Sequence, residues 1–410
     1  MKTRAGGWLS MYIRGLTAFL GCCLLCVDAF AQSMTPLSFD FAPGGNAGAH
    51  PLYDAERGFG FEASAPANFS VRVPEGNYRV TVRFGGQRPI SQTTVQAEQR
   101  RLMIESVGAS RGKTIERSFI VNVRTPALGA LPANAPGGSA VQLKPRELGS
   151  YTWDEKLNLE FSGNIAAVRS VSIAAADVPT LYLAGDSTVT DQPTAPNASW
   201  GQMLPRFFAP DIAVANHAES GETLKSFVTE LRLDKLLSKL KAGDWVMIQF
   251  GHNDQKVQWP QTYAEAATTY RSWLRTYVAE VRRRGATPML VTSPERRNFD
   301  AAGRIVPSLG GYPDAVRAVA KEESVALIDL NLMSVRFYEA LGPEKSPRAF
   351  ADEGRDKTHH NEFGAYRLAL MVVEGVRGAD AALSGGLAAH LAPDIPRFDP
   401  DNPAAAPSTP

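Results

Sequence analysis

The sequence predicts an α/β protein in which an antiparallel β-sandwich precedes a doubly wound parallel sheet. Two observations support this prediction. Between residues 35 and 176, short runs of alternating apolar and polar residues are separated by glycine and proline, which is typical of a β-sandwich. Between residues 180 and 384, short apolar runs alternate with stretches of helical periodicity, which is typical of parallel strands joined by helices. We therefore expect two domains with these bounds.

The β-sandwich is predicted from alternation that would bury one face of each strand. Two alternating runs, 69–73 and 78–84, flank the turn signal Pro74–Asn77, and we interpret them as a hairpin. Arg100 and Arg101 in this domain are candidates for contact with a glycan. Purely structural roles for these two arginines are the alternative.

The parallel sheet is predicted from five short apolar runs. These runs lie at 181–184, 212–215, 245–250, 288–292 and 325–329. Between them, residues 270–281 place apolar side chains on one helical face, and Gly285 follows as a C-cap. A last helix is expected at 362–377. From 385 to 410 the chain is rich in proline and alanine, and we expect a tail outside the domain.

Composition excludes some classes of partner. The chain has 410 residues, a formal net charge of +1 and 44% hydrophobic residues, which is ordinary for a soluble globular protein. A chain this close to neutral lacks the positive field that draws proteins to nucleic acid or to anionic membranes. We therefore expect neither as a partner.

Residues 1–31 have the features of a signal peptide. Basic residues such as Arg4 precede the apolar run Leu16–Val27, and Ala29–Ala31 fits a small-residue cleavage site. All three cysteines fall within this segment, so the mature chain is expected to lack disulfides and thiol chemistry. We expect a secreted or periplasmic protein with no membrane attachment after cleavage. An uncleaved anchor is the alternative.

Polar residues suited to catalysis follow the predicted strands or precede the last helix. The candidate site residues are Ser187, Gly221, Asn253, Asp356 and His359. Four of the six histidines fall within these segments, a concentration that core packing does not explain. Because ligands bind at the carboxyl ends of the strands in open α/β sheets, we expect these residues to meet there.

These residue types are suited to ester hydrolysis at a serine. Ser187 would be the nucleophile, His359 its general base, and Asp356 the carboxylate that orients the imidazole. The backbone N–H groups of Ser187 and Gly221 and the side-chain amide of Asn253 would stabilise the oxyanion. A turn glycine and a helix cap are the alternatives for the last two.

The segment before the last predicted helix could instead be a metal site. His359 and His360 with Asp356 supply residue types that bind zinc. Two adjacent histidines do not favour that interpretation, and we expect neither a metal nor a cofactor. His360 is expected to have a structural or supporting role.

The residue sequences of these segments resemble the four conserved blocks of the SGNH (GDSL-type) hydrolases. The blocks are A-G-D-S-T-V-T-D-Q, N-H-A-E-S-G, Q-F-G-H-N-D and D-K-T-H-H-N-E-F-G-A. They look like the rhamnogalacturonan acetylesterase family in its bacterial form with an added N-terminal β domain. The resemblance runs from about Thr180 to Arg377. Thr188 stands where the family's name implies leucine, a variation that suits this branch.

The resemblance implies a fold and an activity. The fold would be a flavodoxin-like, three-layer α/β/α hydrolase domain, preceded by a galactose-binding-like β-sandwich. The activity would be removal of acetyl groups from pectin (rhamnogalacturonan), with an acetylated pectic polysaccharide or oligosaccharide as substrate and no metal. Another SGNH activity, on xylan acetate, sialate or lipid acyl esters, stays open, as does a non-catalytic glycan-binding protein.

Two arginines are candidates for binding the carboxylates of a pectic substrate. Arg296 and Arg297 follow the predicted strand 288–292, so they lie at the expected edge of the sheet. A solvated basic loop is the alternative.

Overall fold

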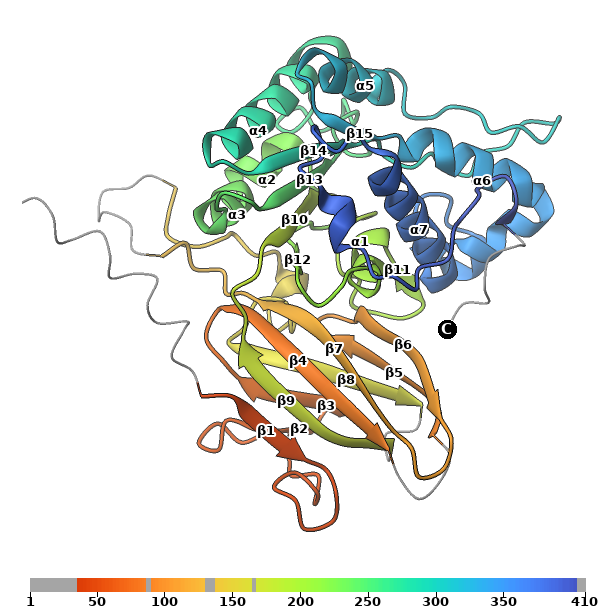
Figure 1. Cartoon of the computed structure of the whole chain (residues 1–410). Helices are drawn as coiled ribbons and strands as arrows, with labels where there is room; N and C mark the ends of the chain where they lie inside the picture. Colours follow the sequence, from red (N-terminus) through yellow and green to blue (C-terminus); the bar gives the residue numbers. More distant parts are fainter. Residues whose placement is uncertain (1–34, 86–89, 130–136, 164–166, 404–410) are drawn as a thin grey trace, which may run out of the picture.

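A computed structural model of the chain describes residues 35–85, 90–129, 137–163 and 167–403. The predicted signal peptide, 1–31, therefore lies outside the described residues. Figure 1 shows two stacked domains, a β domain followed along the chain by an α/β domain. Among the described residues, no helix has the length and apolar character needed to cross a membrane.

The β domain is a sandwich of two antiparallel sheets. The first sheet contains, in spatial order, β1 (Leu37–Asp40), β9 (Val168–Ala175), β4 (Gly76–Gly85) and β7 (Thr114–Val123). The second contains β2 (Phe59–Glu62), β3 (Ala65–Arg72), β8 (Lys156–Gly163), β5 (Ile90–Ala97) and β6 (Arg101–Ala109). Apolar side chains of both sheets, such as Phe69 and Val80, form one buried core. The predicted β-sandwich is confirmed.

The predicted hairpin at 69–84 is wrong. The first run belongs to β3, which pairs with β2 and β8, whereas the second belongs to β4, which pairs with β7 and β9. Pro74–Asn77 therefore carries the chain from one sheet to the other. Alternation identified the buried faces correctly, because Phe69 and Val80 are both fully buried. It does not identify the neighbouring strand, since either sheet can bury the same face.

The α/β domain is built on a five-stranded parallel sheet. Its spatial order is β12 (Ala213–Asn216), β10 (Thr180–Gly185), β13 (Trp245–Gln249), β14 (Thr287–Val291) and β15 (Ala326–Ile328). In chain order this is 2-1-3-4-5, the flavodoxin-like arrangement. Each predicted strand of this sheet is confirmed to within one residue at either end. The strands are buried on both faces, which explains their continuous apolar runs.

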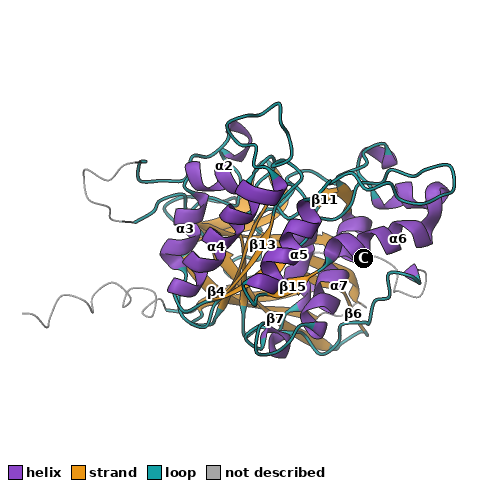
Figure 2. Cartoon of the chain, turned by 90° about the horizontal axis from the view of Figure 1, so that it is seen from above, coloured by secondary structure: helices purple, strands orange, loops and turns teal. Residues whose placement is uncertain are grey.

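Helices cover both faces of this sheet, which completes the three layers. One face packs against α2 (Leu224–Thr229), α3 (Arg232–Lys239), α4 (Arg271–Arg283) and α5 (Tyr312–Glu322). The other packs against α1 (Trp200–Met203), α6 (Leu330–Lys345) and α7 (Glu362–Gly378). Figures 1 and 2 show α2, α3 and α4 on one side of the sheet and α6 and α7 on the other. The predicted helices at 270–281 and 362–377 correspond to α4 and α7.

Short elements join these layers. The 3₁₀ helices are η2 (Pro145–Glu147), η4 (Leu204–Phe207), η6 (Ser346–Ala349), η7 (Asp352–Gly354) and η8 (Leu387–His390), and η5 (Ala266–Tyr270) is a π-helical turn. A small antiparallel pair, β11 (Asn197–Ala198) and β16 (His360–Asn361), connects the loop after β10 with the start of α7. This pair brings two distant parts of the chain together.

The segment after residue 385 differs from the predicted tail. Leu387, Ile395 and Phe398 are buried in the core beside α7, and the backbone N–H of Ala392 donates to Phe207 O at 3.0 Å. The described part of the segment, up to residue 403, therefore belongs to the α/β domain. Proline and alanine correctly indicated little regular structure, but a few apolar anchors suffice to hold an irregular segment.

Polar contacts join the two domains. Arg101 is buried and its Nε lies 2.7 Å from Asp191 Oδ2, while Arg100 Nη1 donates to Asn197 O at 3.0 Å. Lys235 of α3 pairs with Glu75 of the β domain at 2.6 Å. Arg100 and Arg101 thus contact the α/β domain, and the structure supports their structural role instead of the predicted glycan contact.

Candidate active site

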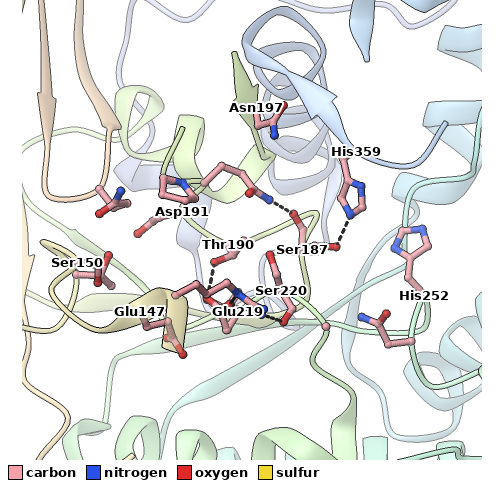
Figure 3. A pocket seen from close by; sticks show the side chains of 18 of the residues that line it. Glu147, Ser150, Ser187, Thr190, Asp191, Asn197, Glu219, Ser220, His252 and His359 are labelled. Carbon is pink, nitrogen blue, oxygen red and sulfur yellow. Dashed lines mark hydrogen bonds and ion pairs between the residues drawn. The ribbon is translucent and has the colours of Figure 1, made fainter. Parts of the chain in front are cut away.

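Ser187 lies in the loop that leaves the carboxyl end of β10. Its Oγ is 2.9 Å from His359 Nε2 (Figure 3). His359 Nδ1 is 2.8 Å from Asp356 Oδ2. The structure therefore brings three of the predicted site residues into one continuous hydrogen-bonded chain. The serine follows the first strand of the α/β domain, whereas the aspartate and the histidine lie in the loop before α7. The β11–β16 pair holds that loop beside the serine loop.

The loop from Asp356 to His359 is held by the carboxylate itself. Asp356 Oδ1 accepts hydrogen bonds from the backbone N–H groups of Thr358 at 2.6 Å and His359 at 2.8 Å. Partial burial would raise the pKa of Asp356, but the bonds from His359 and Thr358 outweigh it and hold that pKa well below its ordinary value. The ionised carboxylate favours a proton on His359 Nδ1, so Nε2 can accept the Ser187 proton.

Gly221 and Asn253 line the same cleft as Ser187. Gly221 has φ +84°, in the left-handed region that favours glycine. Asn253 Nδ2 donates to Glu222 O at 3.0 Å, which leaves its second amide hydrogen available to the cleft. Within the described residues, the backbone N–H groups of Ser187 and Gly221 have no acceptor. The predicted oxyanion donors are therefore gathered beside the serine with unused donor capacity.

The cleft has a volume of about 670 Å³ and is lined by both domains. In Figure 3, Glu147 and Ser150 of the β domain lie across the cleft from His359 and His252 of the α/β domain. Four basic residues line it, namely Arg124, Arg146, Lys256 and Arg296. Four acidic residues also line it, namely Glu147, Asp191, Glu219 and Asp356, so both basic and acidic groups surround Ser187.

The two arginines predicted to bind substrate have different positions. Arg296 lines the cleft, and its Nε donates to Thr358 Oγ1 at 3.2 Å. Arg297 is not among the lining residues, because its guanidinium packs over the ring of Phe350 at 5.1 Å. The structure brings only Arg296 to the site.

A second aspartate–histidine pair lies beside the serine. His252 lines the cleft, with Nδ1 3.5 Å from Asp186 Oδ2 and Nε2 2.9 Å from Pro294 O. Burial would raise the pKa of Asp186, but bonds from His252 and Thr188 lower it below the ordinary value. This buried carboxylate adds negative charge beneath the Ser187 loop.

His360 packs against Tyr338 in the interior of the α/β domain. It is buried and lies 2.7 Å from the Tyr338 hydroxyl, and burial together with repulsion from His359 and His252 lowers its pKa to about 3. In the parts of the chain that the structure describes, no group of three or more His, Cys, Asp or Glu residues is placed to hold a metal ion.

Sequence reasoning missed the contribution of the β domain. Six residues of the link between β7 and β8 line the cleft: Arg124, Arg146, Glu147, Ser150, Thr152 and Trp153. They lie more than 30 positions before Ser187 and match no motif. Only the packing of the two domains places them at the site.

Comparisons with known proteins identify the family. Residues 183–367 match the GDSL-like lipase/acylhydrolase family. The rhamnogalacturonan acetylesterase RhgT of Bacillus subtilis is 43% identical over 209 residues, which cover 48% of this chain and 88% of that protein. The chain belongs to the GDSL-like lipase/acylhydrolase family. This GDSL-like hydrolase is a carboxylic ester hydrolase, in agreement with the arrangement of Ser187, His359 and Asp356.

Two further similarities cover more of the chain than the α/β domain alone. The uncharacterised esterase YxiM of Bacillus subtilis is 27% identical over 336 residues, which cover 80% of this hydrolase and 79% of YxiM. The solved structure of YxiM covers 84% of this chain and 98% of its own, with 24% identity and a TM-score of 0.47.

Proposed function

We propose that this GDSL-like hydrolase removes acetyl groups from a pectic polysaccharide of the rhamnogalacturonan type. The observation that carries the proposal is the chain of hydrogen bonds from Ser187 Oγ to His359 at 2.9 Å and from His359 to Asp356 at 2.8 Å. The names of RhgT and of a second relative, the probable rhamnogalacturonan acetylesterase YesY (38% identical over 200 residues), support the choice of substrate.

In the first half of the reaction, Ser187 Oγ attacks the acetyl carbonyl carbon while its proton passes to His359 Nε2. Asp356, held ionised by its hydrogen bonds, stabilises the imidazolium that forms. The carbonyl oxygen becomes an oxyanion that accepts hydrogen bonds from Ser187 N–H, Gly221 N–H and the Asn253 amide. His359 then returns the proton to the departing sugar oxygen, which leaves an acetyl-serine.

In the second half, His359 Nε2 takes a proton from a water molecule as that water attacks the acetyl carbon. The same donors stabilise the second oxyanion, and collapse of this intermediate returns the proton to Ser187 Oγ. Acetate is released and the free serine is restored. No step requires a metal or an organic cofactor.

Basic side chains of the cleft support an acidic polymer as substrate, because three of the four acidic residues that also line it are already paired with arginines. Arg146, Lys256 and Arg296 line the cleft, and arginine pairs well with sugar carboxylates. Arg124 also lines it; its guanidinium packs over the Trp153 ring, and its buried Nε and Nη1 have no hydrogen-bond partner among the described residues. Pectic chains carry such carboxylates, whereas lipid acyl chains and neutral glycans do not.

Acetate release tests the proposed reaction and the proposed substrate together. The wild type should release acetate from acetylated rhamnogalacturonan faster than from acetylated xylan. Ser187→Ala should lower turnover by roughly four to six orders of magnitude on both, while Ser187 labelling by an aryl phosphonate should be stoichiometric. Near-full activity of Ser187→Ala would refute the mechanism, and faster release from xylan would refute the pectic substrate alone.

We also propose that the enzyme is exported and acts outside the cytoplasm, on the basis of residues 1–31. The full chain expressed in a bacterium should yield a mature protein that begins at Gln32, as read by mass spectrometry. Replacing Ala29 and Ala31 by bulky residues should block this cleavage. A mature protein that retains Met1 and stays with the cytoplasmic fraction would contradict export.

A further inference from the structure

The peptide bond between Ser220 and Gly221 is held by two basic residues of the β domain. Ser220 O accepts a hydrogen bond from Lys144 Nζ at 3.0 Å and another from Arg146 Nη2. Both side chains come from the link between β7 and β8, at or next to η2. In the proposed mechanism, the N–H of the same peptide bond donates to the oxyanion.

The orientation of the carbonyl determines the orientation of the N–H. A trans peptide is planar, and its C=O and N–H point in opposite directions. Two cationic donors on Ser220 O therefore keep the Gly221 N–H on the other side of the peptide plane. Gly221, at φ +84° with no side-chain atom nearer than 4.0 Å to its would-be Cβ, offers little steric resistance to a rotation of this peptide. Without the two donors, the peptide could rotate, and Ser220 O would then face the oxyanion where the Gly221 N–H should be.

The two basic side chains are themselves fixed. Arg146 Nε donates to Glu219 Oε1 at 2.7 Å, and Lys144 pairs with the buried carboxylate of Glu222. The link that carries them is anchored by Glu147, which accepts from Trp153 Nε1 at 2.9 Å and from the buried Arg232 of α3 at 3.0 Å. The segment is therefore a built part of the site and not a loose loop.

We propose that Lys144 and Arg146 are positioning residues that hold the Ser220–Gly221 peptide with its N–H toward the oxyanion, so that the β domain completes the active site. Their positive charges also polarise this peptide, which makes its N–H a better donor. This inference rests on the proposed function, because it concerns one of the proposed oxyanion donors.

Steady-state kinetics on a neutral aryl acetate test the proposal, since such a substrate makes no use of sugar contacts. Lys144→Met and Arg146→Met should each lower kcat about tenfold and the double variant about a hundredfold, because losing one oxyanion donor costs about 10² to 10³ in kcat. KM should stay within about threefold. The rate of inactivation by an aryl phosphonate should fall in parallel, since its phosphoryl oxygen uses the same donors.

A matched control separates this role from a general effect on the domain interface. Lys239 of α3 pairs with Glu75 of the β domain at 3.2 Å and does not line the cleft. Lys239→Met should leave kcat within about twofold of the wild type. Arg146→Lys, which keeps a cation on a side chain that is 52% exposed, should recover part of the lost rate.

The possible outcomes are distinct. If the double variant folds with a wild-type melting curve and keeps its kcat, the positioning role is refuted while the proposed function stands. If Ser187→Ala also keeps its kcat, the proposed function itself has failed. If Lys144→Met does not fold, the exposed Arg146 variants decide the question. A raised KM with an unchanged kcat in these variants would overturn the proposal.

Discussion

The two walls of the cleft are built differently. On the α/β side, the residues proposed to do chemistry lie in loops at the carboxyl ends of parallel strands, and short backbone contacts such as those of Asp356 hold them. On the β side, Lys144 and Arg146 belong to an irregular link and are held mainly by ion pairs with the α/β domain. The chemistry is thus assigned to one domain and the support of an oxyanion donor to the other. Variants on each wall should therefore fail in different ways.

After Ser187→Ala, the largest effect is expected on the α/β wall from Asp356→Asn. The asparagine amide would donate to His359 Nδ1 and leave the proton on Nε2, where the ring can no longer accept from Ser187. We expect kcat on an aryl acetate to fall about 10³- to 10⁴-fold in a protein that stays folded at the assay temperature.

Asp352 provides the matched control for this variant. It is an exposed aspartate close to the same loop and pairs with Arg355. Asp352→Asn should leave kcat within about twofold. A loss below about tenfold in Asp356→Asn would mean that the carboxylate does not orient His359.

Asp356 also predicts a difference in acid stability. Its pKa is held well below the ordinary value near about 4. The ionised form therefore contributes stability above about pH 4, and this contribution is lost as the pH falls through the folded-state pKa. Urea unfolding between about pH 5 and pH 2.5 should show a smaller loss of stability in Asp356→Asn than in the wild type. Parallel curves for the two proteins would contradict the lowered pKa.

A second variant on the same wall tests an oxyanion donor directly. Asn253→Ala should lower kcat about 10²- to 10³-fold while KM changes little, because the amide is used only when charge develops on the substrate oxygen. Asn298→Ala, at a residue that does not line the cleft, should behave like the wild type. A raised KM with an unchanged kcat for Asn253→Ala would assign the amide to substrate binding instead.

The sequence predicted the α/β wall far better than the β wall, for a physical reason. Ser187, Asp356 and His359 are chemically distinctive residues next to strands or a helix that periodicity locates, and parallel strands bring their ends together. Arg146 and Trp153 have no such signal, because a surface arginine and a packed tryptophan are common in any sandwich. Their role depends on how two domains pack, which local patterns do not encode.

The same limit explains the errors within the β domain. The runs 69–73 and 78–84 were predicted to pair because they are neighbours in sequence, yet they lie in opposite sheets. Arg101 was considered as a glycan contact because it is charged, yet it is buried against Asp191. Hydrophobic alternation and charge indicate which environment a residue prefers, but they do not identify the residue or strand that it contacts.

Substitutions at the interface between the two domains should lower the free energy of unfolding more than they change catalysis. Arg101 and Asp191 form an ion pair at 2.7 Å with both side chains almost fully buried. Arg101→Met leaves the carboxylate buried without its cation, so we expect a loss of about 3 kcal/mol in the free energy of unfolding. Lys241→Met removes an exposed pair with Asp177 near the same interface and should cost less than about 1 kcal/mol. Equal losses in urea unfolding would mean that the buried pair does not hold the domains together.

The smallest effect should come from the one predicted substrate arginine that reaches the cleft. Arg296→Gln should raise KM for acetylated rhamnogalacturonan about three- to tenfold, because one charge-assisted contact with a sugar carboxylate contributes about 1 kcal/mol at a partly exposed site. KM for a neutral aryl acetate should not change. Arg297→Gln is the matched control, since this neighbour packs over Phe350 outside the cleft and should leave both KM values unchanged. If Arg296→Gln instead raised KM equally for the neutral ester, its contact with Thr358, next to His359, would be the cause, and the recognition of acidic sugars would fall to Arg124, Arg146 and Lys256.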